Sequence, residues 1–389
     1  MRQLRIPATY MRGGTSKGVF FVADDLPMNA AERDRWLLRI VGSPDAYGKQ
    51  IDGMGGATSS TSKVVLVSRS SRPDCDVDYL FGAVSIGNPV IDWSGNCGNL
   101  SAAVGPFALE RGLVTNPPKE GVATVRIWQA NIGQKILARV PVVGGQVREL
   151  GDFMLDGVSF PAPEIELEFL EPEPAPGQPA PALFPTGNLV DELRVGNLPP
   201  VPATLIVAGI PTIFIAAASL GLKGTELPDV VNGLPDVLVR AEALRGAGAV
   251  AMGLARNPYE ATRLRPHSPK LALVAPASSY RAADGRQMDG RELDLVCRIF
   301  SMGPMHHAMT GTGGLAIAAA AAIPGTLVHD LRRPGPTDSV CFGHASGRLR
   351  VGIQIEGSGT EWRVISTRMS RSARVLMDGW VRLPAEGLV

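Results

Sequence analysis

The sequence lacks an excess of charge of either sign, and it has few cysteines. Its 38 Lys and Arg residues against 37 Asp and Glu residues leave a net charge of +1. No overall field therefore attracts nucleic acid or an anionic membrane, and we expect neither as a partner. The four cysteines stand far apart without a CxxC spacing, which argues against a zinc site and a disulfide framework: Cys75, Cys97, Cys297 and Cys341.

Signals for export or membrane insertion are also missing. Residues 1–15 contain no apolar core of signal-peptide length, so we expect a cytoplasmic protein. Val195–Leu222 and Met302–Val328 carry no Asp, Glu, Lys or Arg and are long enough to span a bilayer. The first, however, reads as strand, turn and strand around Gly209-Ile210-Pro211, and the second is rich in Ala and Gly, as in a tightly packed internal helix. We therefore predict no membrane span.

The sequence has the length and the fraction of hydrophobic residues needed for two domains. The chain has 389 residues, of which 45% are hydrophobic and 19% charged. Glu171–Pro185 holds six prolines in fifteen residues and reads as a linker. We place the domains at residues 1–183 and 184–389, with the last strand able to return to the first domain. Helices are predicted at Ala30–Val41, Leu100–Arg111, Asp236–Arg245, Leu293–Ser301 and Leu315–Ile323.

The two halves share a pattern of predicted elements. Each begins with a strand, a Gly-containing turn and a strand, at Thr9–Val22 and Thr204–Ile215. Each later places a Gly-rich turn directly before a helix of small residues, at Gly95–Ala103 and Gly311–Ala321. The sequence therefore predicts two related α+β domains, each presenting one helix N-terminus.

The first candidate for chemistry is Cys97, in the loop Gly95-Asn96-Cys97-Gly98-Asn99 before a predicted helix. A helix N-terminus offers unpaired backbone N–H groups and a partial positive charge, so it binds carboxylates and favours the thiolate form of a cysteine. Asn96, Gly98 and Asn99 are predicted to line the same site. The alternative is a buried structural cysteine beside a capping asparagine.

The second candidate is Lys63, which ends the hydroxyl-rich loop starting at Gly53 and begins a predicted strand. A lysine screened from water can lose its proton and act as a base. It can also stay charged and pair with a substrate carboxylate, or be an exposed residue after a flexible loop. Neither this loop nor Gly13–Gly18 has the order of a phosphate-binding Walker A motif, so we expect no nucleotide and no other cofactor.

The third candidate is the loop Thr310-Gly311-Thr312-Gly313, which leads into the Ala-rich helix. Backbone N–H groups and threonine hydroxyls at a helix start can hold an anion, although a simple connection to a core helix fits equally well. Upstream, His306 and His307 are adjacent and should point apart, so we expect no metal site. Arg12 and Arg371 lie in Gly- or Ser-rich settings that suit carboxylate recognition.

Several long stretches of the sequence resemble the PrpF family of 2-methylaconitate cis–trans isomerases, which work beside an AcnD-type dehydratase in propionate breakdown. They are PATYMRGGTSKGVFF, GSPDAYGKQIDGMGGATSSTSK, DWSGNCGNLSAAVGPFA, FPTGNLVDEL and MSRSARVLMDGWV. The resemblance implies a diaminopimelate-epimerase-like α+β fold: two similar domains, each a sheet wrapped around a central helix, with the active site in the cleft between them. It also implies that Lys63 is the principal base and that Cys97 lies across the substrate from it.

The same resemblance implies a small polycarboxylate substrate bound by Arg12, Thr15 and Ser16 together with the two helix-start loops. Epimerases of this fold use one cysteine from each domain, and here the second loop, Met309–Gly314, has none. A two-cysteine racemisation is therefore not expected. Alternatives are a 4-oxalomesaconate tautomerase, a methylitaconate isomerase, or a non-catalytic accessory protein of an AcnD-type 2-methylcitrate dehydratase. We further expect a homodimer or higher oligomer.

Overall fold

The computed structural model describes residues 3–173, 182–196 and 199–384. It divides into two compact units. Unit 1 comprises Met1–Leu167 and Ser370–Val389, and unit 2 comprises Glu168–Met369. The boundary expected from sequence, between residues 183 and 184, falls inside unit 2, next to residues 174–181, which are outside the described ranges.

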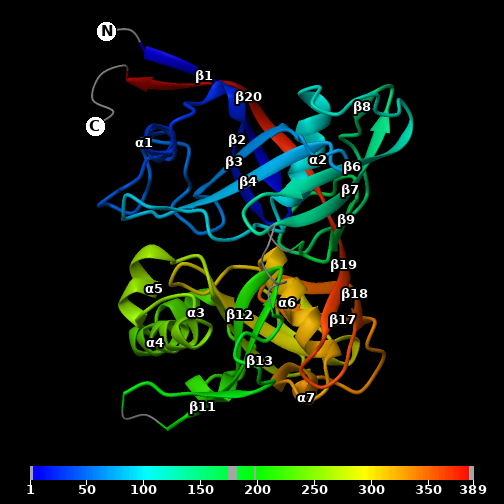
Figure 1. The fold of residues 1–389 in the computed structure, drawn as a ribbon. Helices are drawn as coiled ribbons and strands as arrows, with labels where there is room; N and C mark the ends of the chain where they lie inside the picture. Colours follow the sequence, from blue (N-terminus) through cyan, green and yellow to red (C-terminus); the bar gives the residue numbers. More distant parts are fainter. Residues whose placement is uncertain (1–2, 174–181, 197–198, 385–389) are drawn as a thin grey trace. The chain divides into compact units, whose positions relative to one another are not determined.

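Unit 1 is built on a mixed β-sheet (Figure 1). The pairs β1–β2, β1–β20, β3–β4 and β6–β7 are antiparallel, while β2–β3 and β4–β6 are parallel. Its elements are β1 (Gln3–Gly13), β2 (Ser16–Val22), η1 (Ala23–Asp25), α1 (Ala30–Val41), β3 (Lys63–Arg69), β4 (Val77–Val84), β5 (Ile91–Asp92), α2 (Ser101–Glu110), β6 (Gly121–Gln129), β7 (Gln134–Val143), β8 (Gln146–Val147) and β20 (Ala373–Pro384).

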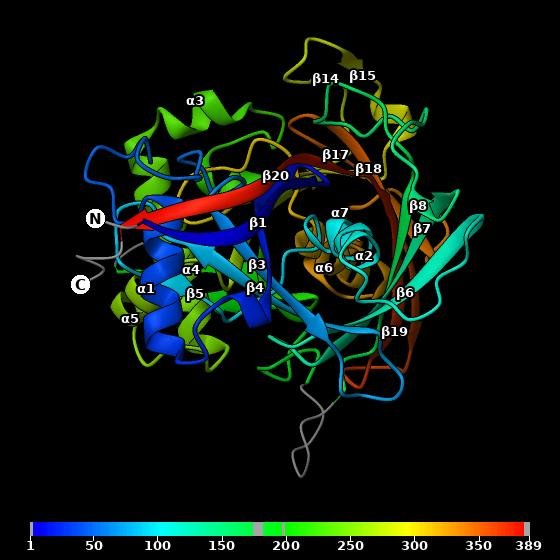
Figure 2. The same ribbon diagram turned by 90° about the horizontal axis from the view of Figure 1, so that it is seen from above.

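The sheet of unit 1 wraps around α2, which has no polar face. Residues Ser101–Ala108 of this helix are all buried. Close approach is possible because the helix is made of small residues: a Cβ added to Gly105 would lie 2.8 Å from Val140 Cγ2 on β7. Figure 2 shows α2 nearly end-on, with β1 and β20 on one side and β6 and β7 on the other. The start of α2 is therefore fixed by surrounding strands.

Unit 2 repeats this plan with a second fully buried helix, α6. Its elements are β10 (Asp191–Leu193), β11 (Val201–Ala208), β12 (Ile210–Ala216), η2 (Ala217–Leu220), α3 (Pro228–Asn232), α4 (Pro235–Ala251), α5 (Pro258–Leu264), β13 (Lys270–Pro276), β14 (Tyr280–Arg281), β15 (Gln287–Met288), η3 (Gly290–Glu292), β16 (Leu295–Phe300), α6 (Gly311–Ala322), α7 (Leu327–Leu331), β17 (Ser339–His344) and β18 (Gly347–Glu356). β9 (Ile165–Leu170) and β19 (Arg363–Arg371) contain the points where the chain passes between units.

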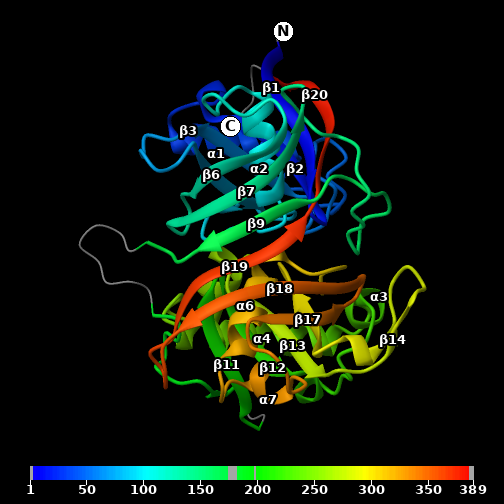
Figure 3. The same cartoon turned by 90° about the vertical axis from the view of Figure 1, so that its right-hand side faces the viewer.

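The order and direction of the strands match between the two units. Each unit has an antiparallel hairpin, β1–β2 or β11–β12. Helical segments, α1 in unit 1 and α3, α4 and α5 in unit 2, then lead to a strand that pairs in parallel with the second hairpin strand, β3 or β13. An antiparallel strand follows, β4 or β16, then the central helix and a second hairpin, β6–β7 or β17–β18 (Figure 3). β4–β6 and β16–β17 are parallel. The predicted repeat is thus present in the strand pairing itself.

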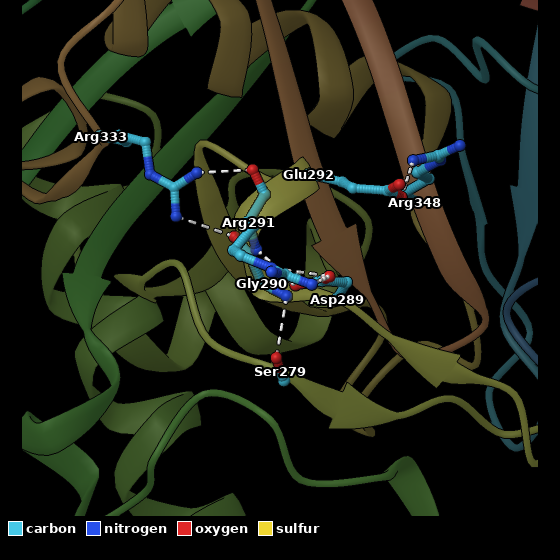
Figure 4. A network of polar contacts seen from close by, with 7 residues as sticks. All are labelled: Ser279, Asp289, Gly290, Arg291, Glu292, Arg333 and Arg348. Carbon is cyan, nitrogen blue, oxygen red and sulfur yellow. Dashed lines mark hydrogen bonds and ion pairs between the residues drawn. The ribbon is translucent and has the colours of Figure 1, made fainter.

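Most predicted elements are confirmed, but the helix expected at Leu293–Ser301 is wrong. These residues form β16, which lies between β13 and β17, and all six residues of the strand are buried. A short apolar run buried on both faces has no periodicity that separates strand from helix. The turn before it is fixed by polar contacts (Figure 4): Arg333 donates to the carbonyls of Gly290 and Arg291.

No helix in the described part of the chain is long and apolar enough to cross a membrane. Of the two uncharged stretches, Val195–Leu222 contains β11 and β12 as expected, and Met302–Val328 contains the internal helix α6, which has twelve residues.

Candidate active site

Lys63 is the first residue of β3 and is buried, with 4% of its surface exposed. Its Nζ lies 4.8 Å from the centre of the Phe81 ring on β4. Within the described residues no carboxylate pairs with it. The reading of Lys63 as an exposed residue after a flexible loop is therefore wrong, because its side chain is buried and its amino group lies over an aromatic ring.

The loop before Lys63 is held by side-chain hydrogen bonds. Gln50 Nε2 donates to Ser43 Oγ at 2.9 Å and to Ser62 Oγ at 2.8 Å, and Gln50 Oε1 accepts from the N–H of Ala57. Ser62 Oγ in turn donates to the carbonyl of Val84 at 2.8 Å. This network fixes the backbone on the N-terminal side of Lys63 and so limits where its amino group can lie.

Cys97 lies in the turn directly before α2 and is also buried, with 7% exposed. Its carbonyl accepts from the N–H of Ser101 at 2.9 Å, so the helical turn starts at Cys97. The cap residue is Leu100, with no side-chain cap, which corrects the idea of a capping asparagine. Tyr79 OH donates to the Cys97 carbonyl at 3.5 Å, and complete burial raises the pKa of Tyr79, so this hydroxyl stays protonated.

Asn99 connects this turn to two distant segments. Its Nδ2 donates to Thr15 Oγ1 at 3.0 Å, and its Oδ1 accepts from Arg371 Nε at 3.1 Å. Burial lowers the pKa of Arg371 to about 10, an effect that neighbouring Cys97 opposes, and the guanidinium remains charged at neutral pH. Unit 1 therefore places a cation beside the Cys97 turn, where no carboxylate of the described residues pairs with it.

Arg12 and Ser16 flank the turn between β1 and β2. Arg12 Nη1 donates to the carbonyls of Gly14 and Ser372, at 3.0 and 2.9 Å. Burial and the nearby Arg374 lower the Arg12 pKa to about 10. The Arg12 side chain also lines a cavity of about 570 Å³ in unit 1. Ser16 is buried and pairs with Gly13 in the strand ladder. The observed bonds of Arg12 support the backbone of the turn; its contact with substrate stays a prediction.

In unit 2, Thr310 is the N-cap of α6, with its Oγ1 accepting from the N–H of Gly313 at 3.2 Å. One of the N–H groups predicted to hold an anion is thus already paired within the loop. Gly311, Thr312 and Gly313 are buried. The prediction that His306 and His307 point apart is wrong: they lie in a loop rather than a regular element, and their rings stack with centroids 4.6 Å apart.

Lys270 was missed by the sequence analysis. It is the first residue of β13 and only 1% exposed, and its Nζ donates to Ser301 Oγ at 2.8 Å and lies 3.2 Å from His267 Nδ1. The sequence does contain a pattern that could have identified it: Lys270, like Lys63, stands directly before a run of apolar residues typical of a strand. Across the three described ranges, no group of three or more His, Cys, Asp or Glu side chains is arranged to hold a metal ion.

Known structures share this fold. A probable proline racemase from Agrobacterium radiobacter, 14% identical, matches with a TM-score of 0.55 over 98% of this chain and 93% of that one, which shows the fold alone. A methylitaconate-delta-isomerase structure is 35% identical, with a TM-score of 0.74 over 100% of this chain and 98% of that one. The molecule is thus an isomerase built from two epimerase-like α+β units, which confirms the predicted enzyme and fold class.

The family follows from the sequence comparisons. The family described as PrpF protein matches residues 3–384, and the chain belongs to this family, as the resemblance indicated. It is 55% identical to a 2-methyl-aconitate isomerase of Cupriavidus necator over 99% of this chain and 98% of that protein. It is 38% identical to a 3-methylitaconate isomerase of Eubacterium barkeri, over 100% of this chain and 99% of that protein.

Proposed function

We propose that this isomerase interconverts the cis and trans forms of 2-methylaconitate by allylic proton transfer, with Lys63 as the base. The observation that carries the proposal is a buried lysine to which no described residue offers a carboxylate partner, in the same unit as Cys97 and the buried cation Arg371. A lysine in that setting can exchange a proton with a carbon acid. The 55% identity to 2-methyl-aconitate isomerases of two organisms supports this choice of substrate.

The first step breaks a C–H bond of the carbon next to the double bond. Neutral Lys63 takes the proton and becomes an ammonium group, while the electron pair of that bond spreads over the allyl system into a carboxylate. Positive groups stabilise the extended enolate that results. In unit 1 we assign this role to Arg371 and to the N–H groups of Gly98 and Asn99. In unit 2 we assign it to the loop Thr310–Gly313. The cap of α6 uses the Gly313 N–H, so the N–H groups of Gly311 and Thr312 are not needed for it.

The second step reverses the first after rotation. With the double bond delocalised, the carbon skeleton turns, and Lys63 returns its proton to the same carbon. Atoms and charge then balance without an external oxidant or a cofactor. Cys97 supplies either a second acid or a wall of the pocket that contacts substrate. Thr15 acts on the site through Asn99, to which it is bonded.

The biological setting belongs to the same proposal. A 2-methylaconitate isomerase would act in the 2-methylcitrate route of propionate breakdown, after an AcnD-type dehydratase, in the cytoplasm. The dehydratase as a functional partner and a homodimeric or higher assembly stay predictions.

The proposal is tested by incubating the purified protein with cis- and trans-2-methylaconitate in D2O and following both isomers by NMR. We expect interconversion with deuterium entering the allylic position. Lys63→Met should lower kcat by about 10²- to 10⁴-fold, the usual contribution of a general base. The matched control is Lys119→Met, which removes an exposed lysine of the same unit.

Two results would contradict this function. The first is near-normal turnover by a folded Lys63→Met variant. The second is faster isomerisation of 3-methylitaconate or 4-oxalomesaconate than of 2-methylaconitate, which would assign the enzyme to the substrate of its 38% or 36% identical relatives instead.

A further inference from the structure

A cavity of about 570 Å³ lies in unit 1, and neither Lys63, Cys97 nor Arg371 lines it. Pro106 and Glu110 of α2 line it, together with β1 and β20 on one side of this helix and β7 and β8 on the other (Figure 2). All the residues that line it belong to unit 1. Small-molecule sites have volumes of roughly 300–1,000 Å³, so the cavity is large enough to hold a ligand.

The charged side chains of this cavity are not paired with one another. They are three arginines and two glutamates: Arg12, Arg148, Arg374, Glu110 and Glu149. Within the described residues, none of these side chains forms an ion pair. Burial and the nearby carboxyl groups of Asp378 and Glu149 raise the pKa of Glu110, so acidic groups already crowd the end of α2. A ligand with several carboxylates would be repelled there, whereas a single carboxylate can bind at the arginines.

Two of the arginines face each other across the sheet. Arg12 and Arg374 are directly opposite on the antiparallel strands β1 and β20. Like charges at opposite positions of paired strands destabilise a sheet. Burial, and then the charge of Arg374, lower the pKa of Arg12 to about 10, so the two guanidinium groups are close enough to repel each other. An anion bound between them would remove this repulsion.

The same two strands provide a comparison, because they hold a second pair of opposite arginines, Arg5 and Arg382. There each arginine has a partner: the Arg5 guanidinium carbon lies 5.3 Å from the centre of the Trp380 ring, and Arg382 Nη1 donates to Gln3 Oε1 at 3.4 Å. Arg374, by contrast, has no hydrogen bond or ion pair from its side chain in the described part of the chain. The pair that lines the cavity is therefore the one with a cation left for a ligand.

Arg12 is fixed in the position that a ligand would need. Its Nη1 donates to the carbonyls of Gly14 and Ser372 at 3.0 and 2.9 Å and to Ser372 Oγ at 3.2 Å. Its Nε and Nη2 make no hydrogen bond to any described residue. A side chain that is already ordered loses little freedom on binding, so Arg12 offers its remaining N–H groups to a carboxylate at low entropic cost.

The rest of the lining is mainly apolar. Leu150 and Phe160 line the cavity although 83% and 71% of their surfaces are exposed. Exposed apolar side chains at a cavity gain free energy when an apolar ligand covers them. Further apolar residues that line it are buried in the unit: Met11, Val140 and Ile165. The cavity thus combines an apolar surface with a pair of cations.

From this arrangement we propose that the cavity is a second ligand site, which binds a monocarboxylate with an apolar chain. The carboxylate lies between Arg12 and Arg374, and the chain lies against Leu150, Phe160 and the buried apolar residues. This site goes beyond the proposed isomerisation, and binding there requires no turnover.

Calorimetric titration of the full chain with octanoate tests the proposal, with 1-octanol as a neutral probe of the same chain length. We expect one octanoate per chain and much weaker binding of 1-octanol. Arg374→Met removes one cation and should weaken octanoate binding by about 10- to 100-fold, the usual effect of losing a charge-assisted hydrogen bond. Arg374→Lys, which keeps the charge, should recover part of the loss. Arg382→Met is the matched control from the pair outside the cavity and should bind octanoate as the wild type does.

A second variant tests the apolar part of the site. Val158 lines the cavity and is half-buried, so Val158→Trp fills space in it and leaves both arginines in place. We expect this variant to lose octanoate binding, and it serves as the test if Arg374→Met does not fold. Octanoate binding by Val158→Trp as tight as by the wild type would contradict the proposal.

Two further results would overturn it. One is equal octanoate affinity of the wild type and a folded Arg374→Met. The other is displacement of octanoate by trans-aconitate, because a tricarboxylate that competes would place octanoate in the substrate site. Neither measurement involves isomerisation, so failure of this inference and failure of the proposed function are observed separately.

Discussion

The loops that precede α2 and α6 occupy the same place in the two repeats but are held in different ways. Before α6, Thr310 caps the helix through its own side chain, so the loop closes on itself. Before α2 no side chain caps the helix. Instead, Asn99 is bonded to Thr15 in the β1–β2 turn and to Arg371 at the end of β19. The loop with Cys97 therefore depends on partners that are distant in sequence.

This difference explains why reactive and binding groups are divided between the loops as proposed. The role proposed for Cys97 needs neighbours that fix its position, and in unit 1 the contacts that hold its loop come from three separate segments. An anion cradle needs little more than the N–H groups of a helix start, which a local cap arranges. The two units share the same strand order, and in unit 1 contacts from distant segments hold the loop to which we assign the chemistry.

The largest effect should come from breaking the long-range support of the Cys97 loop with Gly14→Ala. Gly14 has a φ of +51°, and an added Cβ would collide with the Asn99 side chain, which is held at both ends. We expect a loss of about 2–4 kcal/mol in the free energy of unfolding, from left-handed backbone strain and overpacking together. Activity should fall by more than about 100-fold, because a small misplacement at the site suffices. Urea unfolding and kcat measure the two losses.

Two glycines separate backbone strain from the collision. Gly112 has a similar φ of +63° with open space around it, so Gly112→Ala should cost only the strain, about 1–2 kcal/mol, and leave kcat unchanged. Gly209, in the corresponding turn of unit 2, would place its Cβ 2.8 Å from Leu315 Cδ1, the end of a side chain that can shift. Equal losses of activity in Gly14→Ala and Gly209→Ala would refute the asymmetry between the loops.

The next effect concerns the cation that supports Asn99. Arg371→Met should raise KM by about 10- to 100-fold, because a charge-assisted hydrogen bond to substrate is lost. The melting temperature should stay unchanged or rise. The reason is that the buried charge has no carboxylate partner in the described chain, so burying it costs free energy. Steady-state kinetics and thermal unfolding test this, with the exposed Arg382→Met as control. A large drop in melting temperature with unchanged KM would make Arg371 a structural residue.

The same arginine gives a pH dependence. Its pKa is lowered from 12.5 to about 10 in the folded protein, so the folded state binds this proton less tightly than the unfolded chain. The cost of burying the charge is therefore present below pH 10 and disappears as the pH rises from about 10 towards 12.5. Substrate binding through Arg371 should not change between pH 6 and 8, a range at least two units below that value, and KM measured across it checks this.

Local patterns were enough to find some of these residues and not others. Lys63 and Cys97 stand in Gly- and Ser-rich loops beside a strand or helix, so the chain itself marks them. Lys270 depends on Ser301, 31 residues away, and this partner lay in a segment that was predicted as helix and is mainly strand. Pairing across a sheet is set by tertiary packing, which one-dimensional periodicity does not encode.

The smallest effect should come from the local cap of α6. Thr310→Ala removes the acceptor for the Gly313 N–H and should lower the free energy of unfolding by about 1 kcal/mol, the usual contribution of an N-cap. Thr310→Ser keeps the hydroxyl and is the matched control. Because the rest of the loop is unaffected, KM should change only a few-fold, whereas the Gly14→Ala variant loses most of its turnover. Urea unfolding and steady-state kinetics of Thr310→Ala, Thr310→Ser and Gly14→Ala test this. A loss of activity in Thr310→Ala as large as in Gly14→Ala would mean that activity depends as strongly on the loop of unit 2 as on the loop with Cys97.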